Sequence, residues 1–201
     1  MPFDLFSTAV VLSAVLLVVS GFDYAQRAVR NTFLPVPSTW ILMTVYLSLS
    51  FWMYAKSPRW SIAGNIALTA GVLNIYIILI GVIWGRIRSG TLKVMFDKRQ
   101  KICFLLSAVV VGFFFWKDDE FVSYIALQIV ALIAYWGTVQ KLLHANKYGE
   151  PVFLWLAVLL SALIAIYPAY VKNDFYAWIY IGRAAPSTMG VLWLIWNIRK
   201  K

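Results

Sequence analysis

Charged residues are scarce in this sequence. Only 13% of its 201 residues are charged, whereas 62% are hydrophobic. A soluble globular domain has about 25% charged and about 45–50% apolar residues, so this chain has too few polar side chains to cover a surface in water. The composition excludes an ordinary soluble domain and predicts that a lipid bilayer surrounds most of the chain.

Cysteine and histidine are nearly absent. Cys103 is the only cysteine and His144 is the only histidine. One thiol cannot form a disulfide within the chain, and the two residues together cannot supply the four ligands of a structural zinc site. A single histidine in a basic loop also makes a Ser-His-Asp triad hard to build. We therefore expect no metal, no cofactor and no catalytic residue, and we predict that the chain is not an enzyme.

Acidic residues are also few. Eight Asp and Glu residues stand against 18 Lys and Arg residues, which gives a net charge of +10. Such a charge is common in nucleic-acid-binding proteins, but here the basic residues lie in the gaps between apolar runs, not on one continuous face. Basic residues in such gaps fix the orientation of membrane proteins. The expected partner is therefore the bilayer, and no nucleic acid is expected.

Seven apolar stretches make up most of the chain. A membrane-spanning helix needs about 20 mainly apolar residues, whereas a membrane barrel would need alternating strands of about ten residues, and these stretches do not alternate. No basic residue precedes the first stretch, as a signal peptide would require, so we interpret it as the first span. The sequence predicts an all-α polytopic membrane protein with seven spans, at Leu5–Phe22, Ser38–Ala55, Trp60–Trp84, Ile102–Trp116, Phe121–Gln140, Val152–Val171 and Phe175–Ile198.

The distribution of Lys and Arg predicts the orientation of these spans. With the N-terminus outside and the C-terminus in the cytoplasm, the cytoplasmic segments contain most of the basic residues, including those of 86–101 and 199–201. The outer segments contain only Lys56, Arg59, Lys117 and Lys172. This bias is the usual one for membrane proteins, and it holds only for an odd number of spans.

The first three stretches and the last three show a weak internal duplication. In each half a Gln and a basic residue end a helix, a Pro follows 11 residues after the Gln, and a Trp comes soon after. The matching positions are Gln26, Pro37, Trp40 and Trp60–Ala67 in the first half, and Gln140, Pro151, Trp155 and Trp178–Ala185 in the second. Chance is the alternative explanation, because Trp, Gly and Ala are common here. A true duplication would give two parallel three-helix units, an architecture found in transporters.

This topology resembles the SWEET/PQ-loop (MtN3-like) superfamily of seven-helix transporters, to which the PnuC-type vitamin transporters are similar. The family's Pro-Gln pair is represented by Ala25-Gln26 and Val139-Gln140, in which the proline is lost. The resemblance implies a first three-helix unit at 1–88, a basic loop and linker helix at 89–118, and a second unit at 119–201. It also implies a facilitator that binds a small-molecule solute between the two units. In place of the lost prolines of the family, Pro168 and Pro186 are the residues of this chain able to bend helices.

A few polar residues inside the predicted spans are candidates for a binding site, because polar groups in a membrane are costly and often functional. Arg183 lies about 12 Å into the seventh span without an acid at its depth, so an anionic or strongly accepting ligand group is a reasonable partner. The full set of candidate substrate-binding residues is Asn65, Asn74, Gln128, Arg183, Trp178, Tyr46 and Tyr124. A few polar groups among aromatic side chains suit a small polar ligand.

Other interpretations of these residues stay open. Asn and Gln in membrane helices often bond to a neighbouring helix, Trp and Tyr often lie at the lipid headgroups, and Arg183 could pair with the acids at 118–120. The absence of an intramembrane acid or histidine favours a uniporter over a proton symporter. The alternative function is a non-transporting subunit, a signalling protein or a pore-forming effector. Substrate identity stays open, and a homo-oligomer is possible.

Overall fold

The computed structural model of the chain describes residues 4–33, 35–143 and 151–199, without the side chains of 136–138, 140–142 and 199. His144 and Lys147, and the side chains of Gln140 and Lys141, therefore lie outside the described residues. The described part is helical, with short connections. Its helices are α1 (Leu5–Val29), α2 (Pro37–Lys56), α3 (Ile66–Arg88), α4 (Lys98–Lys117), α5 (Glu120–Leu143), α6 (Val152–Ile164), α7 (Ile166–Val171) and α8 (Phe175–Arg199).

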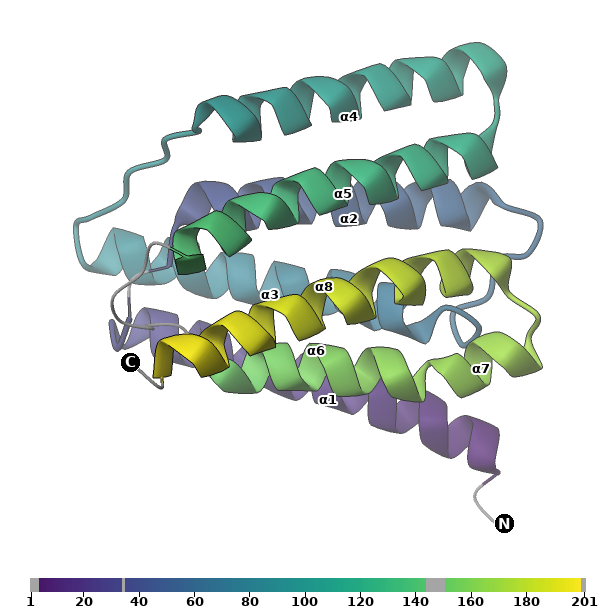
Figure 1. Ribbon diagram of the computed structural model, residues 1–201, viewed down its shortest axis with the longest axis horizontal. Helices are drawn as coiled ribbons and strands as arrows, with labels where there is room; N and C mark the ends of the chain where they lie inside the picture. Colours follow the sequence, from purple (N-terminus) through teal and green to yellow (C-terminus); the bar gives the residue numbers. More distant parts are fainter. Residues whose placement is uncertain (1–3, 34, 144–150, 200–201) are drawn as a thin grey trace.

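The helices run back and forth along one common direction, and α7 continues the course of α6 (Figure 1). The ends of the described chain lie at opposite ends of this bundle, as an odd number of passages requires. Six helical rods form a closed ring in the order α1, α3, α2, α5, α8 and α6, each packed against the next. Helix α4 lies outside this ring at one edge, where it packs against α5 and, less extensively, against α2.

Local signals in the sequence explain where several helices begin. Asp97 and Gln100 form a reciprocal capping box at the start of α4, with Gln100 N donating to Asp97 Oδ1 at 2.8 Å and Asp97 N donating to Gln100 Oε1 at 3.1 Å. Pro37 is the first residue of α2 and Pro151 directly precedes α6, positions where the missing N–H of proline removes no helical hydrogen bond. These starts set the depth at which each helix presents its interior side chains.

The outer surface of the bundle is apolar. Ile80, Leu105 and Phe115 are 67%, 66% and 71% exposed, and many other large apolar side chains of the helices are also exposed. Within the described residues, four helical segments are long and apolar enough to cross a membrane, namely α1, α3, α4 and α6 with α7. Apolar patches of this extent are not stable in water, so the chain is a membrane-embedded all-α protein.

The third and the sixth predicted spans differ most from the helices of the structure. The third span was expected from Trp60, but residues 57–65 form turns and α3 begins at Ile66. The alignment of Trp60–Ala67 with Trp178–Ala185 therefore sets a turn-rich segment against a helix, and this detail is wrong. The sixth span was expected as one helix, but it is interrupted at Ala165, because Pro168 has no N–H to donate to the Ile164 carbonyl. Helix α8 continues through Pro186.

Glycines on α3 allow very close packing against α1. A Cβ atom added to Gly81 would lie 2.4 Å from Ala25 Cβ, and one added to Gly85 would lie 2.5 Å from the Ala28 carbonyl oxygen. Small residues four positions apart are the usual means by which membrane helices approach closely and gain van der Waals contact. The α1–α3 contact is therefore specified by glycine, and it has no room for a larger side chain.

We predict that Gly81→Ala destabilises the protein by about 1–3 kcal/mol, because the added methyl group must push α1 away. The matched control is Gly112→Ala in α4, where nothing lies within 4 Å of the added Cβ, and which should be neutral or slightly stabilising. Thermal unfolding of the detergent-solubilised variants measures both effects. Equal melting temperatures for the two variants would contradict the close α1–α3 contact.

Candidate binding site

A cavity of about 60 Å³ lies inside the ring of helices. Its walls come from α1, α2, α3, α5, α6 and α8, so both halves of the chain contribute to it. The wall is mostly apolar and aromatic, and Arg183 is the only charged residue among the described residues that form it. The remaining lining residues are Leu17, Trp40, Met43, Tyr46, Leu47, Gly71, Asn74, Ile75, Ile78, Tyr135, Leu154, Trp155, Val158, Tyr180 and Ala184.

Arg183 is the central polar group of this cavity. Its side chain is only 8% exposed, and its Nε donates to Gln128 Oε1 at 3.1 Å. The Gln128 amide in turn donates from Nε2 to Ser50 Oγ at 3.0 Å. This chain of hydrogen bonds connects α8 to α5 and α2 and holds the guanidinium in one place, without a bond to the acids at 118–120.

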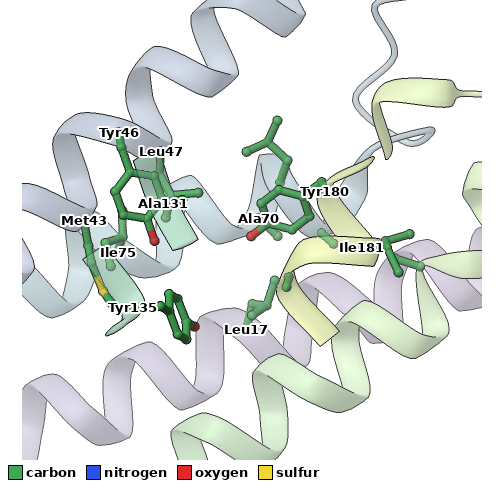
Figure 2. Packing of buried hydrophobic residues seen from close by; sticks show 14 of the residues in the cluster. Leu17, Met43, Tyr46, Leu47, Ala70, Ile75, Ala131, Tyr135, Tyr180 and Ile181 are labelled. Carbon is green, nitrogen blue, oxygen red and sulfur yellow. The ribbon is translucent and has the colours of Figure 1, made fainter. Parts of the chain in front are cut away.

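Three tyrosine rings surround the Arg183 guanidinium. Its central carbon lies 4.9 Å from the ring centre of Tyr180, 5.9 Å from that of Tyr46 and 6.0 Å from that of Tyr135. Figure 2 shows these three side chains directed from α8, α2 and α5 toward one central space. Ring faces attract a cation by about 0.5–2 kcal/mol each at such distances, which offsets only part of the cost of burying the charge.

No carboxylate of the described residues forms an ion pair with Arg183. In the described part of the chain the only ion pair joins Arg27 Nε to Asp23 Oδ2 at 2.9 Å, at an exposed position on α1. Arg183 Nη2 is buried without a hydrogen bond, and so is the indole Nε1 of Trp155 in the same cavity wall. The cavity therefore contains unpartnered donors, one of them charged, which suits a ligand with an anionic or accepting group.

Asn74 has a structural bond in addition to its place in the cavity wall. Its Nδ2 donates to the Leu17 carbonyl oxygen at 2.5 Å and to Ser20 Oγ at 3.2 Å, which joins α3 to α1. Counted from the first residues of their helices, Ile66 and Phe175, Asn74 and Arg183 are both the ninth residue. The two side chains therefore enter one cavity from corresponding depths of α3 and α8.

The other residues proposed from the sequence lie in different places. Of the seven, Arg183, Asn74 and Tyr46 line the cavity, and Gln128 supports Arg183. Asn65 and Tyr124 are buried nearer the α2–α3 connection; the Asn65 side chain lies close to the Tyr124 hydroxyl but forms no hydrogen bond of ordinary geometry. Trp178 is 38% exposed and does not line the cavity.

A second polar cluster closes the bundle at the end where α2 meets α8. Asp174 is 1% exposed, and it accepts hydrogen bonds from the Tyr54 hydroxyl and, at 3.1 Å, from Ala177 N. The Tyr54 hydroxyl also accepts from Ser61 N at 3.0 Å. Arg59 Nη1 adds a bond to the Asn173 carbonyl oxygen at 3.0 Å. These contacts bind the 57–65 connection to the turn before α8.

Sequence reasoning missed Asp174, Tyr135, Tyr180 and Trp155 as parts of these sites. For Asp174 a signal was present, because an Asp directly before an apolar run is typical of a helix N-cap. Its contact with Tyr54 had no local signal, since the two residues are 120 positions apart. The cavity aromatics had none either, because an apolar helix does not indicate which of its faces is interior.

We predict that Tyr54→Phe lowers the free energy of unfolding by about 1.5–3 kcal/mol, because it removes a hydrogen bond to a buried carboxylate. Tyr170→Phe is the matched control, since Tyr170 is 72% exposed and the loss of its hydroxyl should be neutral. Thermal unfolding in detergent compares the two. A Tyr54 variant as stable as the control would mean that the Tyr54–Asp174 bond does not hold this end together.

Comparisons with models of protein families, with curated proteins and with solved structures found no match. The function must therefore be inferred from the geometry of this chain. Its most informative feature is the cavity around Arg183.

Proposed function

We propose that the chain is a facilitator-type membrane transporter that binds a small solute with an anionic or strongly accepting group at Arg183. The observation that carries this proposal is a guanidinium that is 8% exposed, lines a cavity and has an unpartnered Nη2. An unpaired buried charge costs several kcal/mol. A structural role would not require this cost, because Gln at this position could bond to Gln128 without a charge.

We further propose that α2, α5 and α8 also cross the bilayer, which gives seven spans. These helices have 20, 24 and 25 residues, and at 1.5 Å per residue each is at least as long as the hydrocarbon core is thick. They run alongside the four strongly apolar segments (Figure 1). The polar groups of α2 and α8, such as Ser50 and Arg183, are buried inside the bundle, where they need not face lipid.

The order of helix contacts supports two related three-helix units. If α1, α2 and α3 correspond to α5, α6 and α8, the contacts of α3 with α1 and α2 correspond to those of α8 with α5 and α6. The contact of α1 with α6 then corresponds to that of α5 with α2. Asn74 and Arg183, at the same depth of α3 and α8, fit this correspondence. Helix α4, outside the ring, takes the place of the linker.

The position of the cavity favours transport over passive scaffolding. It lies between the two proposed units, where a rocking movement of one unit against the other would expose it to alternate sides. The cluster around Asp174 joins the units at one end of the bundle, so opening at that end would require these bonds to break. The conformation in the structure is therefore closed at that end.

We predict that Arg183→Lys weakens binding of a small carboxylate and that Arg183→Gln weakens it further. Lysine keeps the charge but cannot form the bidentate fork, and glutamine removes a charge-assisted contact, with an expected loss of about 10- to 150-fold in affinity. Titration of the purified protein with three-carbon carboxylates, followed by the shift in melting temperature, measures this order. Arg88→Gln is the matched control, since Arg88 is exposed. Unchanged affinity in Arg183→Gln would leave the residue a structural one.

The proposed orientation places the N-terminus outside and the C-terminus in the cytoplasm. We predict that Lys117→Cys reacts with a membrane-impermeant thiol reagent in intact cells and that Lys93→Cys does not, in a Cys103→Ala background. Both positions are exposed in the structure, so the side of the membrane decides their reactivity. Permeabilised cells, in which both must react, are the control, and the reverse pattern would invert the topology.

A further inference from the structure

The charge balance of the cavity depends on what the cavity binds. Among the described residues, Arg183 is the only charged one that lines the cavity, and none of them forms an ion pair with it. Its Nε is bonded to Gln128, and its Nη2 forms no hydrogen bond of ordinary geometry, although the Tyr46 and Tyr180 hydroxyls lie near the guanidinium. A bound monovalent anion would make the site neutral, whereas without one the closed site contains a lone cation.

We propose that the protein is an exchanger, which carries a monovalent organic anion in each direction far faster than it returns without one. This inference rests on the proposed function, since it assumes a transporter that alternates between two sides. It adds the mode of transport and the charge of the substrate. Arg183 sets both.

The physical reason lies in the closed state through which a carrier must pass. With an anion bound, the guanidinium has a counter-ion and a full set of acceptors, so closing the site around it is favourable. Without the anion, the same closure leaves a charged donor in a low-dielectric, mostly apolar wall. The loss of one charge-assisted contact lowers the population of the closed state by about 10- to 150-fold. The return of the unloaded carrier through this state should therefore be slower by about that factor.

The same balance selects the charge of the substrate. A dianion would neutralise the Arg183 cation with one of its charges and leave the other negative charge without a partner. A zwitterion would bring an ammonium group into a wall without a carboxylate, beside the Arg183 cation. A neutral solute would leave the guanidinium uncompensated. The cavity, at about 60 Å³, further restricts the part of the ligand that it encloses to a small group.

The test uses the full-length protein in liposomes with the voltage clamped by potassium and valinomycin. The probes are radiolabelled lactate, malonate and alanine, which have three carbons each and serve as monoanion, dianion and zwitterion. Uptake is measured into vesicles preloaded with unlabelled lactate and into vesicles without it, with protein-free liposomes as the blank. We expect lactate uptake into preloaded vesicles to be at least about tenfold faster, and malonate and alanine to be poor substrates in both.

Variants of Arg183 separate this inference from the proposed function. Arg183→Gln removes the lone cation, so preloading with lactate should no longer accelerate lactate uptake in this variant. Arg183→Lys retains a cation, and Arg88→Gln changes only an exposed residue, so both should retain the acceleration. Equal rates with and without preloading in the wild type would overturn the exchange mechanism and leave a uniporter. Alanine or malonate uptake equal to that of lactate would overturn the charge selection. Lactate uptake no faster than the blank in either mode would overturn the proposed function itself.

Discussion

The burial of one guanidinium without a carboxylate is the constraint on which the centre of this protein depends. Arg183 is held by Gln128 and flanked by three tyrosine rings, and each of these contacts is weaker than an ion pair. The lipid around the bundle supplies no hydrogen-bond acceptor in place of the missing partner. The surrounding helices must therefore bring acceptors and ring faces to one point, which explains why α2, α5 and α8 all contribute polar or aromatic side chains at this depth.

Close packing elsewhere makes such a site possible. Without a hydrophobic driving force between helices in lipid, association depends on van der Waals contact and hydrogen bonds. Gly81 and Gly85 bring α3 against α1, and Ser13 Oγ lies 2.7 Å from Ser161 Oγ between α1 and α6. These contacts hold the ring together at its periphery. The interior can then contain a cavity without losing the arrangement of the helices.

The sequence predicted the helices well because their signal is local. A long apolar run is sufficient to predict a helix in a membrane. Most of the seven stretches were therefore found with modest errors at their ends. Helix α1 extends beyond Phe22 because Asp23 and Arg27, four residues apart, neutralise each other on its surface. Helix α4 begins at Lys98 because of the capping box at Asp97. The internal duplication stays a prediction, and the match of Trp60–Ala67 with Trp178–Ala185 was wrong, since the turns at 57–65 have no counterpart of equal length before α8.

The candidate site was predictable only in part, because side chains meet across the fold. Depth alone placed Arg183, Asn74 and Gln128 within reach of one another, and Arg183 does bond to Gln128. Which aromatic residues surround them depends on how each apolar helix is rotated, and hydrophobicity carries no information about that when lipid and interior are equally apolar. Trp178 and Trp155 were therefore indistinguishable in sequence, although one is partly exposed and the other lines the cavity.

The separation of Arg183 from Asp174 explains why the charge stays available. The two residues are nine positions apart, which is about 13 Å along a helix, and Asp174 is already bound by Tyr54 and by the backbone of Ala177. An acid that could have neutralised the guanidinium is thus fixed at the end of the bundle, where it joins the two halves. The fold provides hydrogen-bond donors for the Asp174 carboxylate but leaves Nη2 of Arg183 without a hydrogen bond. A protein that needed only stability would gain by pairing them, so their separation supports the proposal that Arg183 binds a ligand.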